Sequence, residues 1–219
     1  MNHAEDSVLA TIFAQCKPGT LKFLTISHYD GNPIFLDVAS GRPEYANRKC
    51  EVLTMGNLDP ALASVTVLRV KGIYPIWTSK AYHGLVELRL IHSASLLYHS
   101  NISISENHLR GILAASPALR ILEFSVEIVE MLPDDASSVP VPLNLLALIN
   151  IAEMSLAQIG IFWRLLAPGS KPLRLAIADN GQIVLCTLKC NGTLCKIPQP
   201  VKFPPSARLM PPSQNTRLG

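Results

Sequence analysis

The chain has 219 residues, of which 48% are hydrophobic and 16% are charged, so it can bury a substantial core and is too apolar for a largely disordered protein. The net charge is +3, but residues 180–219 hold five cations and no acid, which leaves the first 179 residues at −2. This distribution excludes a basic nucleic-acid groove on the folded body, because phosphate binding needs clustered lysine and arginine.

The first predicted unit is a helix followed by a strand. Asp6 or Ser7 can cap the helix, because side-chain oxygens there satisfy free first-turn N–H groups. Pro18-Gly19 ends it. The apolar face of this helix is expected to hold Val8, Leu9, Ile12, Phe13 and Cys16, and the strand that follows is marked by Leu21, Leu24 and Ile26.

Residues 27–59 are rich in Gly, Pro, Asn and Asp, which predicts an irregular excursion with a short strand near residues 34–38. Two further strands follow, centred on Leu68 and Leu88. These two leucines are only 20 residues apart. The link between them therefore has room for a loop or a single helical turn, not a long helix.

The clearest unit covers residues 103–126. Ser103 and Glu106 have the S-x-x-E spacing of a capping box, and Pro117 ends the helix. A strand is expected at 119–126, and a loop follows it over residues 132–142.

Residues 143–167 contain only Glu153 and Arg164 as charged residues, so a membrane span has to be considered. A buried strand around Ile149 and a helix fit better, because a charge lies near the middle of the segment and Ser155 and Gln158 form a second capping box inside it. The apolar face of this helix is expected to hold Leu156, Ile159, Trp163 and Leu166.

The last elements are strands. Pro168-Gly169 ends the preceding helix, a sixth strand runs through Leu173, Leu175 and Ile177, and residues 183–188 add a seventh strand or a cap. Residues 196–219 are rich in proline without apolar periodicity, which predicts a disordered or polyproline-like tail after a domain at 1–195.

The predicted strands recur along the chain. Their second leucine positions, at 24, 68, 88, 122, 149 and 175, are separated by 44, 20, 34, 27 and 26 residues. Most steps lie in or near the period of leucine-rich repeats, in which each unit buries its apolar face against a neighbour. The predicted fold class is α/β: a leucine-rich-repeat-like horseshoe solenoid with parallel strands on the concave face and helices and irregular loops on the convex face.

Catalytic, cofactor and metal motifs are missing from the sequence. Cys186, Cys190 and Cys195 lack the paired spacing of a zinc ribbon. The histidines are scattered, and Asp134-Asp135 lies in a Ser/Pro-rich loop that favours a solvated turn. We therefore expect no enzymatic activity, no cofactor and no metal, with an enzyme of unknown class as a distant alternative.

The candidate binding surface consists of the strand residues that alternate with the inward-facing leucines. Its mixed charge favours a protein partner over a nucleic acid or a membrane. Trp77 is a candidate anchor, with packing over the repeat core as the favoured alternative. The candidate surface residues are Thr25, Arg69, Lys71, Glu87, Arg89, Glu123, Ser125, Asn150 and Arg174.

Three stretches, at residues 67–91, 104–128 and 140–177, resemble the leucine-rich part of fungal F-box-type proteins, in which an LxxILxxSPxLRxLxF unit recurs. The resemblance covers about residues 20–178 and implies a horseshoe that presents substrates to a cullin-based ubiquitin ligase through a small adaptor. Residues 1–20 contain no F-box.

The sequence thus predicts a non-enzymatic protein-protein interaction module whose partner binds the concave face. The alternative is the substrate-recognition part of an F-box-type ubiquitin ligase receptor that lacks its F-box. The odd number of cysteines and an N-terminus without a charged n-region favour an intracellular protein, cytoplasmic or nuclear.

Overall fold

The structure of the chain is a computed structural model that describes residues 9, 11–28, 33–37, 51–54, 58–92, 102–130, 139–179 and 182–188. The predicted proline-rich tail at 196–219 and the acidic pair Asp134-Asp135 lie outside the described residues.

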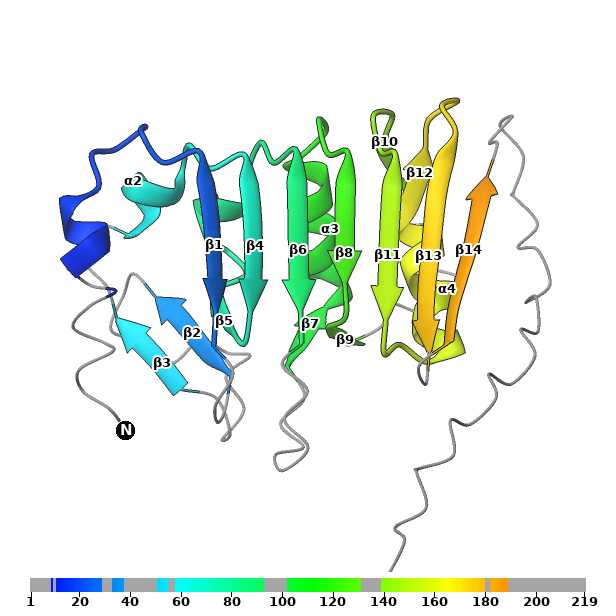
Figure 1. Cartoon of the computed structure of the whole chain (residues 1–219), viewed down its shortest axis with the longest axis horizontal. Helices are drawn as coiled ribbons and strands as arrows, with labels where there is room; N and C mark the ends of the chain where they lie inside the picture. Colours follow the sequence, from blue (N-terminus) through cyan, green and yellow to red (C-terminus); the bar gives the residue numbers. More distant parts are fainter. Residues whose placement is uncertain are drawn as a thin grey trace, which may run out of the picture.

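The fold is mixed α/β and is built on a mostly parallel sheet of seven strands (Figure 1). The first six strands are parallel to their neighbours and follow one another across the sheet in chain order, whereas the last strand is antiparallel. The strands, in sheet order, are β1 (Phe23–Ser27), β4 (Val67–Lys71), β6 (Glu87–Ile91), β8 (Ile121–Phe124), β11 (Leu148–Ala152), β13 (Leu173–Asp179) and β14 (Gln182–Leu188).

The register of the sheet aligns the repeated apolar positions of the sequence. Leu24 pairs with Leu68, Leu68 with Leu88, Leu88 with Leu122, Leu122 with Ile149, and Ile149 with Leu175. All six side chains are buried. The second apolar position of each strand forms a parallel row two residues further on, from Ile26 to Ile177. The predicted strands are confirmed, including the seventh.

Helices and short strands cover one face of this sheet (Figure 1). The helices are α2 (Leu58–Leu62), the 3-10 helix η1 (Lys80–Tyr82), α3 (Glu106–Ala114) and α4 (Leu156–Leu165). The short strands form three small parallel sheets: β2 (Ile34–Asp37) with β3 (Glu51–Thr54) and β5 (Ile73–Pro75), β7 (Ser103–Ser105) with β9 (Glu127–Val129), and β10 (Val141–Leu143) with β12 (Leu166–Pro168).

The two main helices begin at serine caps. Ser155 and Gln158 form the predicted capping box of α4. The box predicted from Ser103 and Glu106 is wrong, because Ser103 belongs to β7 and Ser105 caps α3, accepting a hydrogen bond from the backbone N–H of His108. Glu106 is instead fully buried at the start of the helix.

The apolar faces of the helices differ in part from expectation. In α4, Ile159 is buried as predicted, but Leu156 is 88% exposed and Leu166 belongs to β12. Residues 11–15 are helical. Phe13 is buried there, whereas Ile12 is half exposed.

The segment at 143–167 forms the end of β10, the strand β11, the helix α4 and the start of β12. The predicted strand and helix, which the sequence favoured rather than a membrane span, are therefore present. Among the described residues, none of the helices has the length and apolarity that crossing a membrane requires.

Candidate functional site

The second face of the large sheet carries the polar residues that the sequence singled out. Because side chains alternate along a strand, the residues between the buried leucines point away from α3 and α4. We call this the outward face. Within the described ranges no helix or strand covers it (Figure 1).

Five side chains on four adjacent strands join into one network on the outward face. Arg69 donates to both carboxylate oxygens of Glu87, with Nε–Oε1 at 2.7 Å and Nη2–Oε2 at 3.1 Å. Arg89 donates from Nε to the same Glu87 Oε1 and from Nη1 to Glu123 Oε2 at 3.0 Å. Asn150 donates from Nδ2 to Glu123 Oε1 at 3.0 Å. We call this the arginine-glutamate network.

Charge compensation is strongest at Glu87. Its side chain is only 9% exposed, and the hydrogen bond from Arg69 holds the pKa of its carboxyl below the ordinary value despite burial, with further contributions from Arg89. The same hydrogen bond raises the pKa of Arg69. Glu87 is therefore an anion enclosed between two guanidinium groups.

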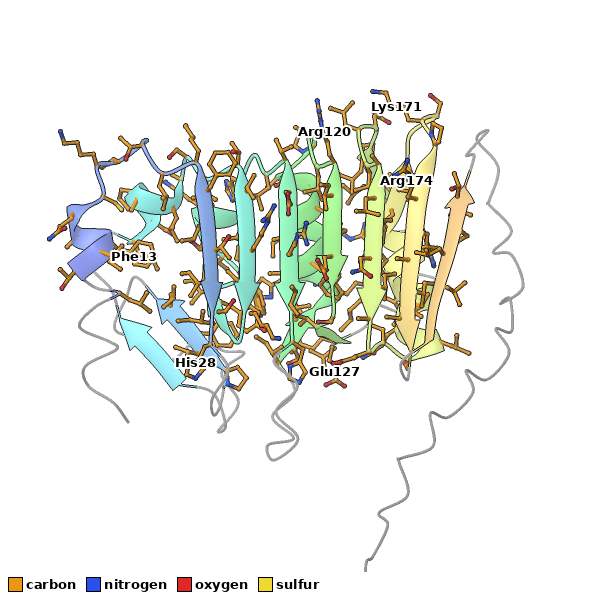
Figure 2. All side chains as sticks on the ribbon, in the orientation of Figure 1. Phe13, His28, Arg120, Glu127, Lys171 and Arg174 are labelled. Atoms are coloured by element: carbon orange, nitrogen blue, oxygen red, sulfur yellow. The ribbon has the colours of Figure 1, made fainter. Side chains whose placement is uncertain are left out.

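The other predicted surface residues lie around this network. Thr25 pairs in register with Arg69, and Lys71 lies at the end of β4 beside Ser27 and Ile91. Ser125 follows β8 and accepts a hydrogen bond from the backbone N–H of His92 at 2.6 Å. Arg174 is exposed near the start of β13, as Figure 2 shows.

Trp77 is not an anchor on the surface. It is only 3% exposed, contacts Phe35, Tyr74 and Tyr82, and donates from Nε1 to the backbone oxygen of Ser103 at 3.1 Å. A side chain enclosed in this way cannot insert into a partner, so the candidate anchor is corrected to a core residue. The alternative, packing over the core, describes its place.

Sequence reasoning missed the apolar residues of the outward face. Phe23, one row before Thr25 on β1, is 71% exposed. It shares its row with Val67, Ile121 and Leu148, which are half-buried. At the other edge of the sheet, Leu185 on β14 pairs with Ala176 and is 76% exposed. Continuing the alternation toward the start of each strand, by one more residue on the same face, would have identified the row of Phe23, Val67, Ile121 and Leu148.

The described residues include no group of three or more His, Cys, Asp or Glu side chains that could hold a metal ion. Of the cysteine cluster only Cys186 is described. It lies half-buried on β14, and burial raises the pKa of its thiol. Cys190 and Cys195 lie outside the described residues.

Comparison of the chain with protein-family models, with curated proteins and with solved structures found no match.

Proposed function

We propose that the chain is a non-enzymatic protein-protein interaction module, built as a leucine-rich-repeat-like horseshoe solenoid, and that a protein partner binds the outward face of its large sheet. The observation that carries this proposal is the asymmetry of the sheet. One face packs against the helices and small sheets, while the other presents the arginine-glutamate network beside exposed apolar side chains.

The repeat character rests on the register of the strands. Six parallel strands place the same buried position side by side, and each strand is joined to the next through helices or short strands on one face. This is the arrangement in which each unit buries its apolar face against a neighbour. A face formed by many neighbouring strands suits an extended partner.

The chemistry of the outward face also favours a macromolecular partner. The arginine-glutamate network is spread over four strands, and its two arginines and two glutamates neutralise one another through ion pairs. Catalysis needs groups that converge on one reacting atom. Mixed charge beside apolar residues is typical of a protein interface, where charges select the partner and apolar contacts add affinity.

The test is quantitative affinity capture of partners by the full chain and by variants. Arg89→Glu and Glu123→Arg each disrupt the network, whereas Ala157→Glu introduces the same side chain as the first variant at an exposed site on α4, behind the sheet. Circular dichroism and thermal unfolding establish that all three variants fold.

We expect a partner that the unaltered chain and Ala157→Glu capture equally and that both network variants lose. Equal capture by all folded variants would show that the outward face is not the binding surface.

A further inference from the structure

The outward face presents more positive than negative charge. Its charged side chains in the described strands are Arg69, Lys71, Arg89 and Arg174 against the two carboxylates Glu87 and Glu123. The excess is two positive charges on a body whose first 179 residues have a net charge of −2. The surplus of cations is therefore a local property of this face.

The excess of positive charge is larger still among the solvent-exposed groups, because the arginines are more exposed than the glutamates. The carboxylate side chains lie low in the network, with Glu87 at 9% and Glu123 at 22% exposure. The guanidinium side chains lie above them, with Arg69 at 44% and Arg89 at 33%. An approaching partner thus meets arginine before glutamate, and the acids act on it mainly by holding the arginines in place.

Both arginines of the network have N–H groups that make no hydrogen bond within it. Arg69 uses Nε and Nη2 on Glu87, and Arg89 uses Nε and Nη1 on Glu87 and Glu123. Within the described part of the chain, Nη1 of Arg69 and Nη2 of Arg89 have no acceptor. The two residues are register partners on adjacent strands. A carboxylate is the group that planar guanidinium donors bind best among protein side chains.

Apolar residues lie directly beside these donors. Phe23 and Val67 occupy the row next to Arg69, and Ile121 and Leu148 continue that row beyond Glu87. Nucleic acids need dense cations along the phosphate backbone, whereas here the cations alternate with acids and apolar side chains. The pattern fits a polypeptide that carries acidic and apolar residues.

We infer that the outward face binds an acidic polypeptide segment, with carboxylates of the segment on Arg69 and Arg89 and its apolar side chains against Phe23 and the row beside it. This inference rests on the proposed interaction function and adds the chemistry of the partner.

The test selects ligands for the full chain from a phage-displayed library of random peptides. We expect the selected peptides to be enriched in Asp and Glu, and a synthetic copy of one to bind less tightly as salt rises, because salt screens exposed charges. Removing one arginine, in Arg69→Gln or Arg89→Gln, should weaken that peptide about tenfold or more. Arg120→Gln is the control: Arg120 is an exposed cation beyond the N-terminal end of β8 (Figure 2), and its loss should change affinity less than twofold.

Three outcomes would overturn the inference, and they differ in what they leave of the proposed function. Neutral or basic peptides whose binding is lost in Phe23→Ser would leave the outward face as a binding surface with the wrong partner chemistry assigned. No selected peptide, or peptides insensitive to Phe23→Ser and to both arginine variants, would overturn both proposals. A single-stranded oligonucleotide that binds more tightly than the best acidic peptide would also overturn the acidic-polypeptide assignment.

Discussion

Arg69 and Glu87 form a bidentate ion pair between adjacent strands, with both contacts at hydrogen-bonding distance. The pair is diagonal, because the register partner of Arg69 is Arg89 and that of Glu87 is Val67. Two arginines directly opposite each other would repel. Glu87 removes this repulsion, since its Oε1 accepts from the Nε of both. The carboxylate thus allows two neighbouring strands to present arginine side by side.

Neutralising Glu87 should reduce stability in a pH-dependent way. Its pKa is lowered in the folded chain, so its stabilising contribution is present above the unfolded value of about 4.3 and is lost as pH falls through the folded pKa. We expect Glu87→Gln to lower the free energy of unfolding by about 1 kcal/mol near neutral pH. The difference from the unaltered chain should shrink as pH falls through the lowered folded pKa of Glu87, because the carboxyl is then protonated in both states.

Urea denaturation at two pH values, one neutral and one in acid below the folded pKa of Glu87, measures this difference. Glu153→Gln is the matched control, since Glu153 is exposed and takes part in no ion pair among the described residues. A Glu87→Gln effect that is equal at both pH values would contradict an ionised, paired carboxylate.

The close approach of Gly169 to the turn after β10 leaves no room for a side chain. A Cβ there would lie 2.7 Å from the backbone oxygen of Asn144 and 2.8 Å from its Cα. A Cβ at Gly160, in α4, would have no heavy atom within 4 Å outside the backbone of its own helix. We expect Gly169→Ala to destabilise the fold by about 1–3 kcal/mol, because backbone must move. Gly160→Ala should stabilise it by about 0.5–1 kcal/mol, because alanine favours a helix.

If Gly169, after β12, lies against the backbone of Asn144, after β10, the two variants shift the midpoint of thermal unfolding in opposite directions. A neutral or stabilising Gly169→Ala would show that this contact is looser than described.

The sheet could be predicted from the sequence because its signal is local and repeated. Each strand shows the same alternation around a leucine or isoleucine, and parallel strands paired in register bring these equivalent positions into one row. This is why the positions from Leu24 to Leu175 could be assigned to one row from the sequence alone. The polar residues between them followed from alternation alone.

The features that could not be predicted depend on contacts between distant segments. The small sheets pair stretches as short as β7 and β9, whose three residues each carry little pattern. Packing of Trp77 over the core could be proposed from the sequence, but its contact with Phe35 could not, because Phe35 comes from an irregular stretch. Ser103 and Ser105 both precede the helix α3, and only the pairing of β7 with β9 decides that the second one is the cap.

Ser116 connects the chain after α3 to the turn between η1 and β6 through its buried hydroxyl. Oγ donates to the backbone oxygen of Tyr82 at 2.8 Å and accepts from the backbone N–H of Leu85 at 3.1 Å, and the residue is fully buried. Ser116→Ala leaves both backbone groups without that partner and should cost about 2 kcal/mol of unfolding free energy. Ser170→Ala, at an exposed position, should change it by less than about 0.5 kcal/mol. Equal midpoints for the two variants in urea would argue against the hydroxyl bridge.

Glu106 ties α3 to α4 from a fully buried position. Its Oε2 accepts from Arg164 Nη2 at 2.7 Å, whereas Arg110 Nη2 lies 3.6 Å from its Oε1. Glu106→Ala should lower the free energy of unfolding by about 3–5 kcal/mol, since it leaves a partly buried arginine without its counter-charge. A double-mutant cycle with Arg164→Ala should give a coupling of about 1–3 kcal/mol.

A double-mutant cycle of Glu106→Ala with Arg110→Ala is the internal control. It measures coupling within α3, for comparison with the Glu106–Arg164 coupling between α3 and α4. At 3.6 Å, and between residues one turn apart on the same helix, that pair should couple by about 0.5 kcal/mol. If its coupling equals or exceeds that of the pair between the helices, Glu106 stabilises α3 alone and does not hold α3 and α4 together.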